Sequence, residues 1–336
     1  MMLSDILKMI FSLALILLSC ELFTNGIEWL GKKLNLGDGV VGSIFSAIGT
    51  CLPETMIPII AILFSRGSTN SEDVGIGAIM GAPFMLSTLA FFLTGASVIL
   101  FSKKRKAGLK MYVNNRTLSR DIGFFILVYT SGLAASFINV PLIKYAIAVS
   151  LVLFYIYYIM LTVKNDTVSH SELNGLYFNI SLKSKTSLRL ILLQIAIALT
   201  GIILGAELFV EIITDISNTL HIPALILSLI IAPIATELPE KFNSIIWISK
   251  SKDTLALGNI TGAMVFQSCI PVTIGILSTS WQLDKIARIS ASFAILSAVT
   301  VFLWIKIKGQ LSYLPLLIGG AFYTVFIVFL TFGNGT

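Results

Sequence analysis

Two short stretches of the sequence place carboxylates inside otherwise apolar segments. Residues 47–57 read AIGTCLPETMI, and residues 234–245 read IATELPEKFNSI. Both contain the pattern T-x-L-P-E, which ends at Glu54 in the first stretch and at Glu240 in the second. Ionisable groups are costly within a lipid-spanning segment, and those that occur there usually serve a function. The repeated pattern is therefore the first candidate for a site with chemistry of its own.

The proline in each copy alters the backbone hydrogen bonding around it. Proline has no N–H and frees the carbonyl about one turn earlier, so Pro53 and Pro239 are expected to break their helices. The freed carbonyl oxygens belong to Gly49–Thr50 and to Ala235–Thr236. In lipid such groups persist only where they face protein, water or an ion.

The two copies together supply the oxygen ligands that a hard cation prefers. A threonine hydroxyl stands four residues before each glutamate, at Thr50 and Thr236, and so shares its helical face. Carboxylates, hydroxyls and freed carbonyls make an all-oxygen site, and Ca²⁺ takes about six to eight such ligands. Two glutamates balance one divalent ion and can hold protons or monovalent cations in its absence. The alternative is that the prolines only kink packed helices and that the glutamates are neutral or paired.

The composition places these patterns in a membrane protein. Of 336 residues, 56% are hydrophobic and 12% are charged, about half the charged fraction of a typical soluble domain. Apolar runs of about twenty residues, each able to cross about 30 Å of hydrocarbon, recur along the chain. The sequence predicts an all-α polytopic membrane protein with ten transmembrane helices. The expected spans are residues 6–30, 39–65, 74–101, 121–139, 141–162, 189–217, 222–249, 255–279, 286–307 and 312–332.

An internal repeat relates the two halves of the chain. Glu54 and Glu240 lie 186 positions apart, and GIGAIMG from Gly75 resembles ALGNITG from Ala256. Each half holds five predicted spans, an odd number, so the second half must enter the membrane in the opposite orientation. Transporters built from such inverted-topology repeats place their substrate sites near the middle of the bilayer, where the repeats meet.

The basic residues predict the orientation of the chain. With the N-terminus outside, 17 of the 23 Lys and Arg residues fall in inward-facing connections, as the positive-inside rule requires. The predicted division is a first five-helix repeat at 1–162, a cytoplasmic linker at 163–188 and a second five-helix repeat at 189–336. Both termini are then non-cytoplasmic, and the expected host is the plasma membrane. The basic cluster Lys103–Lys106 is interpreted as a topology determinant beside lipid headgroups.

The paired T-x-L-P-E patterns, the glycine-flanked blocks after them and the ten-span inverted repeat resemble the cation/Ca²⁺ exchanger superfamily. The closest resemblance is to its Na⁺/Ca²⁺ antiporter branch, and it covers almost the whole chain. It implies that Glu54 and Glu240 ligate Ca²⁺ and Na⁺ in turn, with Thr50 and Thr236 lending hydroxyl and carbonyl oxygens. It also implies alternating access, in which the first and sixth spans slide against the rest.

Some expected oxygen ligands are missing, and more are missing from the first half. Asn259 remains in the second glycine-flanked block, and Gln267 stands where the family has Asn or Asp. The corresponding residues of the first half are Ala78 and Leu86. Both blocks end in alanine instead of serine, at Ala82 and Ala263. Asn259 and Gln267 therefore join the predicted ligands.

An added carboxylate distinguishes the second copy. The family has serine directly after the threonine, whereas this chain has Cys51 and Glu237. Glu237 lies four residues before Lys241, the order that favours a helical ion pair. The pair either neutralises itself, or Glu237 acts as a third ligand or proton carrier. In a further alternative, Lys241 occupies a vacated cation site as a tethered charge.

The sequence predicts a secondary antiporter that exchanges Ca²⁺, or a similar divalent cation, for Na⁺. The alternatives are H⁺ coupling, an uncoupled cation channel and a non-transporting sensor with the same fold. No enzymatic activity is expected, because the spans offer no convincing nucleophile–base pair. The expected partners are the transported ions and membrane lipid, with no organic cofactor, no nucleic acid and no obligatory protein partner.

Overall fold

The fold is described by a computed structural model. The described residues are 2–34, 51–64, 69–165, 175–182 and 187–332. All regular secondary structure in these ranges is helical. In chain order, the elements are α1 (Met2–Lys33), α4 (Leu52–Ile59), the π-helix η2 (Ile60–Phe64), α5 (Thr69–Met85), the π-helix η3 (Leu86–Ala90), α6 (Phe91–Leu100), α7 (Asn115–Ala135), α8 (Pro141–Asn165), α9 (Tyr177–Leu182), α10 (Leu188–Leu220), α11 (Ala224–Ser249), α12 (Asp253–Ser278), α13 (Lys285–Lys308) and α14 (Tyr313–Phe332).

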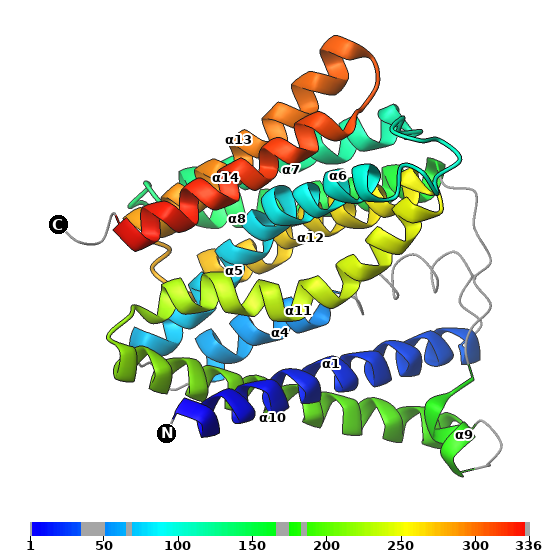
Figure 1. Cartoon of the computed structure of the whole chain (residues 1–336). Helices are drawn as coiled ribbons and strands as arrows, with labels where there is room; N and C mark the ends of the chain where they lie inside the picture. Colours follow the sequence, from blue (N-terminus) through cyan, green and yellow to red (C-terminus); the bar gives the residue numbers. More distant parts are fainter. Residues whose placement is uncertain (1, 35–50, 65–68, 166–174, 183–186, 333–336) are drawn as a thin grey trace.

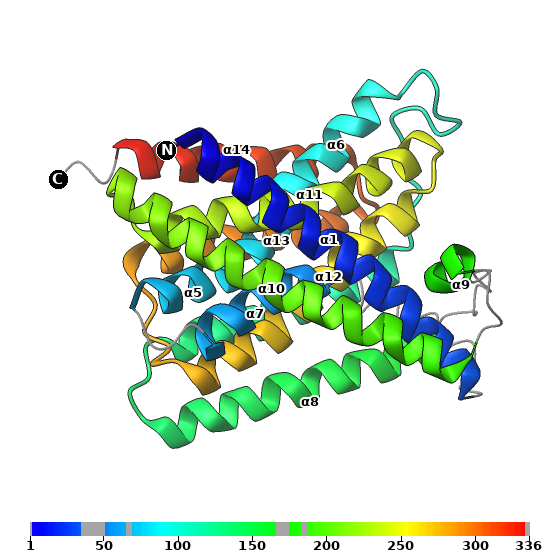
Figure 2. The ribbon, with the colours of Figure 1, turned by 90° about the horizontal axis from the view of Figure 1, so that it is seen from below.

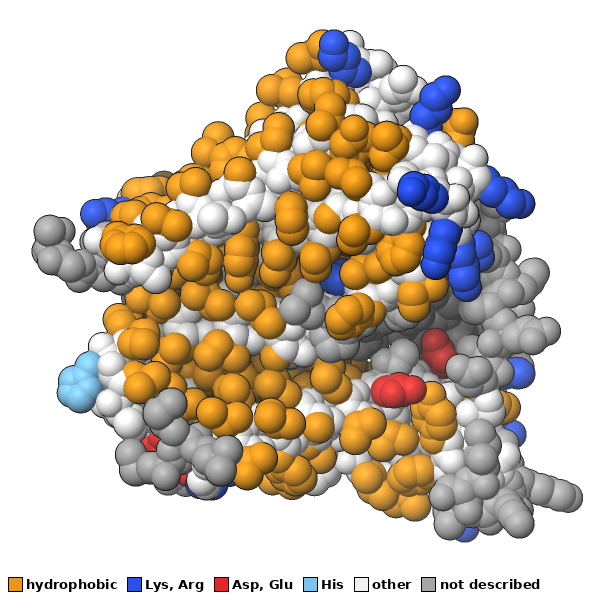
Figure 3. Space-filling model, in the orientation of Figure 1, with side chains coloured by type: hydrophobic (Ala, Val, Ile, Leu, Met, Phe, Trp, Pro, Cys, Tyr) orange, Lys and Arg blue, Asp and Glu red, His pale blue; other side chains and the backbone are white. Residues whose placement is uncertain are grey.

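Seven helical segments of the described chain are long and apolar enough to cross a membrane. They comprise α1, the continuous segment from α5 to α6, α8, α10, α12, α13 and α14. Helices α7 and α11 also lie where spans were expected, and part of the expected span 39–65 lies outside the described residues. That all ten segments cross the membrane, as two inverted repeats, remains a prediction. Figure 3 shows one face that is mostly hydrophobic, with the visible Lys and Arg side chains gathered mainly toward one side.

The helices form layers, with α1 and α10 as a separate pair on one side of the molecule (Figure 1). Helices α4, α5 and α11 lie in the middle, and α7, α13 and α14 lie on the far side. In the view from below, α1 and α10 run side by side across the front of the central helices (Figure 2). The first and sixth predicted spans are therefore neighbours, although they are far apart in the sequence.

Close packing and buried amides hold α1 and α10 together. A Cβ atom on Gly205 would lie only 2.8 Å from Cγ1 of Ile16, so glycine lets the helices approach at this point. The buried Gln194 amide donates to Leu22 O at 2.8 Å and to Asn25 Oδ1 at 3.0 Å. An amide that is buried between helices must be satisfied there, which fixes the register of the pair.

The described end of the linker is attached to the same helix pair. The backbone N–H of Tyr177 donates to Asn25 Oδ1 at 3.1 Å, and that of Phe178 donates to Gln194 Oε1 at 3.0 Å. The Tyr177 hydroxyl donates to Glu21 Oε1 at 2.7 Å, and this hydrogen bond raises the pKa of the phenol. The short helix α9 thus extends the polar network of α1 and α10.

The two halves of the chain meet where α5 crosses α11. A Cβ atom on Gly77 would lie 2.5 Å from Leu225 O, and one on Gly81 would lie 2.7 Å from Cγ of Pro233. The Ser228 hydroxyl donates to a backbone carbonyl of α5 at 2.7 Å. The glycines of the first block therefore let α5 pack directly on the backbone of α11.

The two prolines of the T-x-L-P-E copies have different effects on their helices. Helix α4 begins at Leu52, so Pro53 lies in the first turn, where its missing N–H has no intrahelical partner to lose. Helix α11 runs without interruption from Ala224 to Ser249 and includes Pro239. The expected break of the seventh span at Pro239 is therefore wrong. One missing backbone donor leaves the rest of the hydrogen-bond ladder in place.

A buried ion pair anchors the basic connection between α6 and α7. Arg105 Nη1 lies 2.8 Å from Asp253 Oδ1, and both side chains are fully buried. Arg105 Nη2 donates to Asp253 Oδ2 at 3.0 Å, and the backbone N–H of Tyr112 donates to the same oxygen at 2.9 Å. For Arg105, the interpretation as a headgroup-facing topology determinant is wrong. The other basic residues of the cluster are exposed.

Candidate cation site

A small cavity between α4, α5 and α11 brings together one residue from each T-x-L-P-E copy. It is too narrow to admit a water molecule, and Glu54 and Thr236 are both among its lining residues. Glu54 is 5% exposed and Thr236 is 1% exposed. A carboxylate from the first half and a hydroxyl from the second half thus border the same buried space.

Helix geometry explains how these two side chains are placed. Glu54 lies in the first turn of α4, where the helix dipole favours negative charge. The Thr236 hydroxyl donates to Ala232 O, one turn earlier in α11, at 2.9 Å. Because that bond uses only the proton, the oxygen lone pairs of Thr236 remain able to contact a cation.

The rest of the cavity wall is apolar. Ala78 and Ala82 of α5 line it, at two positions where the resemblance implied side-chain oxygens. The close approach of α5 to α11 through Gly77 and Gly81 brings these alanines to the cavity. The first half therefore contributes the Glu54 carboxylate here without side-chain oxygens from α5.

In the second half, a lysine ammonium lies between two of the predicted ligands. Lys241 Nζ is 3.2 Å from Glu237 Oε2, and both side chains are 2% exposed. Lys241 Nζ also donates to Asn259 Oδ1 of α12 at 3.2 Å. The ion pair that the spacing favoured is present, so Glu237 neutralises Lys241.

Several predicted ligands are not among the described residues that line the cavity. Gly49 and Thr50 lie outside the described residues, as does the side chain of Glu240. Ala235 is half-buried in α11. Gln267 of α12 is 1% exposed, and its Nε2 has no hydrogen-bond partner among the described residues.

A further buried carboxylate, Asp121, was missed by sequence reasoning. Asp121 opens the fourth predicted span and is 2% exposed. Its Oδ1 pairs with Arg120 Nη2 at 3.0 Å, and its Oδ2 accepts the Thr261 hydroxyl at 3.0 Å. Thr261 belongs to ALGNITG, so the network ties α7 to the glycine-flanked block of α12. The available signal was the Arg–Asp doublet at the start of an apolar run.

The described residues contain no group of three or more His, Cys, Asp or Glu side chains placed to hold a metal ion. Any cation at the cavity would therefore depend on mixed oxygen ligands, including hydroxyls and carbonyls, as hard cations accept. A helical membrane protein with a buried carboxylate where its halves meet has the features of a cation transporter.

Comparison with known families gives the class directly. The family model described as sodium/calcium exchanger protein matches residues 5–164 and again residues 190–332. The chain therefore belongs to the sodium/calcium exchanger family, a family of membrane transporters, and the expected family is confirmed.

Relatives and solved structures agree over most of the chain. An uncharacterised membrane protein of Methanocaldococcus jannaschii is 25% identical over 76% of each chain, and the putative antiporter CaxA of Alkalimonas amylolytica is 22% identical over 88% of each. A crystal structure of the H⁺/Ca²⁺ exchanger CAX superposes with a TM-score of 0.73 at 18% identity, covering 98% of this chain and 82% of that one. The sodium–calcium exchanger NCX_Mj gives 0.54 at 20% identity, covering 98% and 100%. At these identities the structures establish a shared fold.

Proposed function

We propose that this protein is a secondary antiporter that exchanges Ca²⁺ for Na⁺ across a membrane by alternating access. The observation that carries the proposal is the cavity where Glu54 and Thr236 meet, in a chain of the sodium/calcium exchanger family. Carboxylates buried inside membrane-spanning helices usually lie on ion pathways, which supports a role for Glu54 in binding the transported cation.

In this proposal, Ca²⁺ binds between the two halves. The Glu54 and Glu240 carboxylates balance its charge, and neutral oxygens complete the shell. The proposed neutral ligands are the hydroxyl and carbonyl oxygens of Thr50 and Thr236, the carbonyls of Gly49 and Ala235, and the amide oxygen of Gln267. Na⁺ replaces Ca²⁺ at the same carboxylates, which makes the two ions competitors.

The pair formed by α1 and α10 is proposed to move as one unit. The Gln194 contacts and the close packing at Gly205 hold the two helices together. Sliding of this pair across the central helices would expose the cavity first to one side of the membrane and then to the other.

Lys241 is proposed to act as a resident cation. Its ammonium contacts Glu237 and Asn259, two residues in the positions of family cation ligands. The fixed positive charge of Lys241 neutralises the Glu237 carboxylate without a transported ion. The second half would then bind fewer monovalent ions than the family pattern implies.

Coupling to H⁺ is the second candidate. Ala78 and Ala82 remove two side-chain oxygens from the wall next to Glu54, which weakens the case for a full Na⁺ shell. A carboxylate with fewer neutral ligands can release Ca²⁺ by binding a proton. Because Glu237 pairs with Lys241, Glu54 and Glu240 are the proton carriers in this version.

The proposed location is the plasma membrane, with both termini non-cytoplasmic. The distribution of 17 of 23 basic residues supports this orientation. Cysteine substitution at exposed termini, followed by labelling with a membrane-impermeant thiol reagent on intact cells, tests it. Termini that become labelled only after lysis would contradict it.

The function itself is tested by ⁴⁵Ca²⁺ uptake into proteoliposomes. One set carries an outward Na⁺ gradient and a second set carries a pH gradient, and each is repeated with Glu54→Gln. Glu211→Gln is the matched control, because Glu211 is an exposed residue of α10. Uptake that depends on the Na⁺ gradient and on Glu54 supports the proposal. Uptake driven by the pH gradient alone would show that H⁺, and not Na⁺, is the counter-ion. Uptake without any gradient would mean an uncoupled channel.

A further inference from the structure

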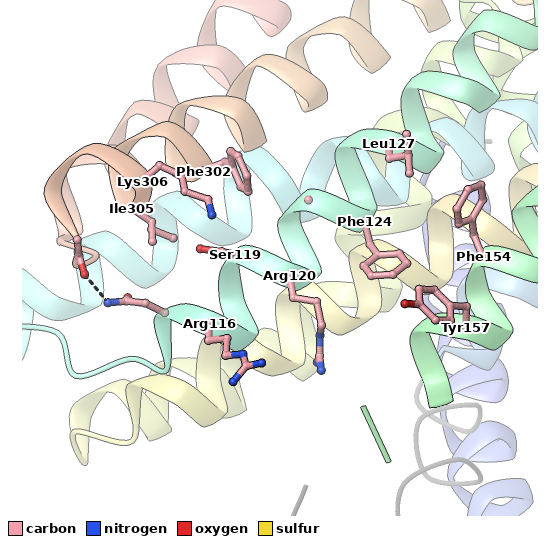
Figure 4. A pocket seen from close by; sticks show the side chains of 13 residues that line it. Arg116, Ser119, Arg120, Phe124, Leu127, Phe154, Tyr157, Phe302, Ile305 and Lys306 are labelled. Atoms are coloured by element: carbon pink, nitrogen blue, oxygen red, sulfur yellow. Dashed lines mark hydrogen bonds between the residues drawn. The ribbon is translucent and has the colours of Figure 1, made fainter. Parts of the chain in front are cut away.

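A groove between α7, α8 and α13 lies apart from the cation site. Its volume is about 730 Å³, and all three helices contribute side chains to it (Figure 4). At one end, the Asn115 side-chain amide donates to Gly309 O at 2.7 Å and joins α7 to the end of α13. This space is hereafter the α7–α13 groove.

One end of the α7–α13 groove is positively charged. Three lining residues, Arg116, Arg120 and Lys306, are basic, and none of the lining residues is acidic. Arg116 and Arg120 extend from α7 in the same direction, and Lys306 extends from α13 toward Ser119 (Figure 4). Asp121 pairs with Arg120, so Arg116 and Lys306 leave an excess of two positive charges.

The rest of the groove is apolar and open. Phe124 and Leu127 continue along α7, and Phe154 faces them from α8. Leu127 is 50% exposed and Phe154 is 37% exposed. The twelve residues from Arg116 to Leu127 span about 16 Å of helix, so the surface changes from basic to apolar within about half a bilayer core.

A ligand that fits both parts has an anionic head and a long apolar tail. The helix α8 that forms one wall is long and apolar enough to cross the membrane, so the open side of the groove would face lipid. Basic clusters at the cytoplasmic ends of spans attract anionic lipid headgroups. In the predicted orientation, this end of α7 is cytoplasmic.

We propose that the α7–α13 groove binds an anionic phospholipid. The headgroup phosphate lies among Arg116, Arg120 and Lys306, and an acyl chain lies over Leu127 and Phe154. Arg120 also holds Asp121, so Arg116 and Lys306 are the residues whose charge can be removed without disturbing that buried pair. Phosphatidylcholine binds less well, because its quaternary ammonium is repelled by the same cations.

Gly123 sets the width of the groove. A Cβ atom there would lie 3.6 Å from Cε2 of Phe302, an ordinary contact, so alanine fits. A leucine side chain at this position would extend into the space that the acyl chain occupies. Gly123→Ala replaces the glycine without filling the groove, whereas Gly123→Leu also fills it. Comparing the two variants therefore shows whether the open volume of the groove is needed for lipid binding.

The charge test uses the full chain purified in detergent and native mass spectrometry. Phosphatidylglycerol and phosphatidylcholine with identical acyl chains are titrated separately, and inorganic phosphate is the third arm. We expect the wild type to prefer phosphatidylglycerol by about 25-fold, since Arg116 and Lys306 each contribute about fivefold near a headgroup. Arg116→Gln/Lys306→Gln should reduce the preference to about twofold, whereas the exposed Lys104→Gln/Lys308→Gln control retains it. Inorganic phosphate should not compete.

The shape test uses the two Gly123 variants under the same conditions. Gly123→Ala should bind phosphatidylglycerol like the wild type, and Gly123→Leu should bind it at least about fivefold more weakly. Circular dichroism checks that each variant keeps its helical content. Equal affinity of both lipids for the wild type, or a phosphatidylglycerol preference unchanged in Arg116→Gln/Lys306→Gln, would overturn the proposal. Competition by inorganic phosphate would show that the groove binds a free anion and would also overturn the proposal.

Discussion

The two T-x-L-P-E copies occupy different helical surroundings. In the first copy, Pro53 starts a helix and Glu54 lies in its first turn, next to the cavity. In the second copy, Pro239 lies within the continuous helix α11. A proline at a helix start costs no hydrogen bond, whereas one inside a helix removes a donor. The same five-residue pattern therefore has two different effects on the backbone.

The copies also differ in the residues that surround their carboxylates. The second copy has Glu237, which is held by the Lys241 ammonium within the fold. The first copy has Cys51 at the equivalent position, and its Glu54 faces a wall that includes Ala78 and Ala82. The second half holds a positive charge beside its added carboxylate, and the first half has alanines along the same wall as Glu54. The comparison suggests that the halves divide the work of ion binding unequally.

The largest expected effect is at the first copy. Glu54→Gln should lower the Ca²⁺ affinity and the uptake rate by about 100-fold or more, because even changes outside the ligand shell cost 10–100-fold. The measurement is ⁴⁵Ca²⁺ uptake in proteoliposomes as a function of Ca²⁺ concentration, with Glu211→Gln as control. Unchanged uptake would mean that Glu54 is structural.

The next largest effect is at Lys241. Lys241→Met leaves Glu237 buried without its ion-pair partner, which should cost about 3–5 kcal/mol of stability. If Lys241 replaces a bound monovalent ion, added Na⁺ should bind at Glu237 and restore part of that stability. The measurement is Tm in detergent against Na⁺ concentration. We expect a steeper rise in Lys241→Met than in the wild type.

Two further variants serve as controls for Lys241. Glu237→Gln/Lys241→Met removes both charges, so its Tm should show the same Na⁺ dependence as the wild type. Lys241→Arg keeps the charge and should behave similarly. A Lys241→Met protein with no additional Na⁺ dependence would contradict the resident-cation proposal and leave the antiport proposal intact.

A smaller effect is expected on stability, and it should differ between equivalent glycines of the two glycine-flanked blocks. A Cβ atom on Gly81 would lie 2.7 Å from Pro233, so Gly81→Ala should cost about 1–3 kcal/mol through overpacking. At the equivalent Gly262, the nearest described atom to a Cβ is the Tyr158 hydroxyl at 3.8 Å, so Gly262→Ala should be nearly neutral. Thermal unfolding of both variants provides the measurement. Equal losses would mean that the two blocks pack alike.

The smallest expected effect restores an oxygen to the first half. Ala78→Asn adds an amide oxygen to the cavity wall and should raise the apparent Na⁺ affinity about threefold, within the 1 ± 0.5 kcal/mol of a typical polar contact. Ala78→Val, with similar bulk near the backbone and no oxygen, is the matched control. The measurement is the Na⁺ concentration for half-maximal exchange. An equal shift in both variants would show an effect of volume alone.

The sequence by itself determined the class of protein, the family and the helical segments. Hydropathy acts over about twenty consecutive residues, so span positions follow from local sequence, and helices occur at all expected spans within the described residues. The Glu237–Lys241 pair was similarly open to prediction, because residues four apart on a helix are neighbours. Sequence could not choose between this pair and a ligand role for Glu237, because that choice depends on contacts from other helices, including Asn259 of α12.

Only the tertiary structure decided which distant residues meet. Arg105 and Asp253 are 148 positions apart, and neither the buried pair between them nor the contact of Asp121 with Thr261 has a local signal. The meeting of Glu54 with Thr236 depends on how α4 and α11 pack, and the continuity of α11 through Pro239 depends on its surroundings as well as its sequence. Helix formation follows from short-range hydrogen bonding, whereas these contacts follow from side-chain shape and burial across the whole molecule.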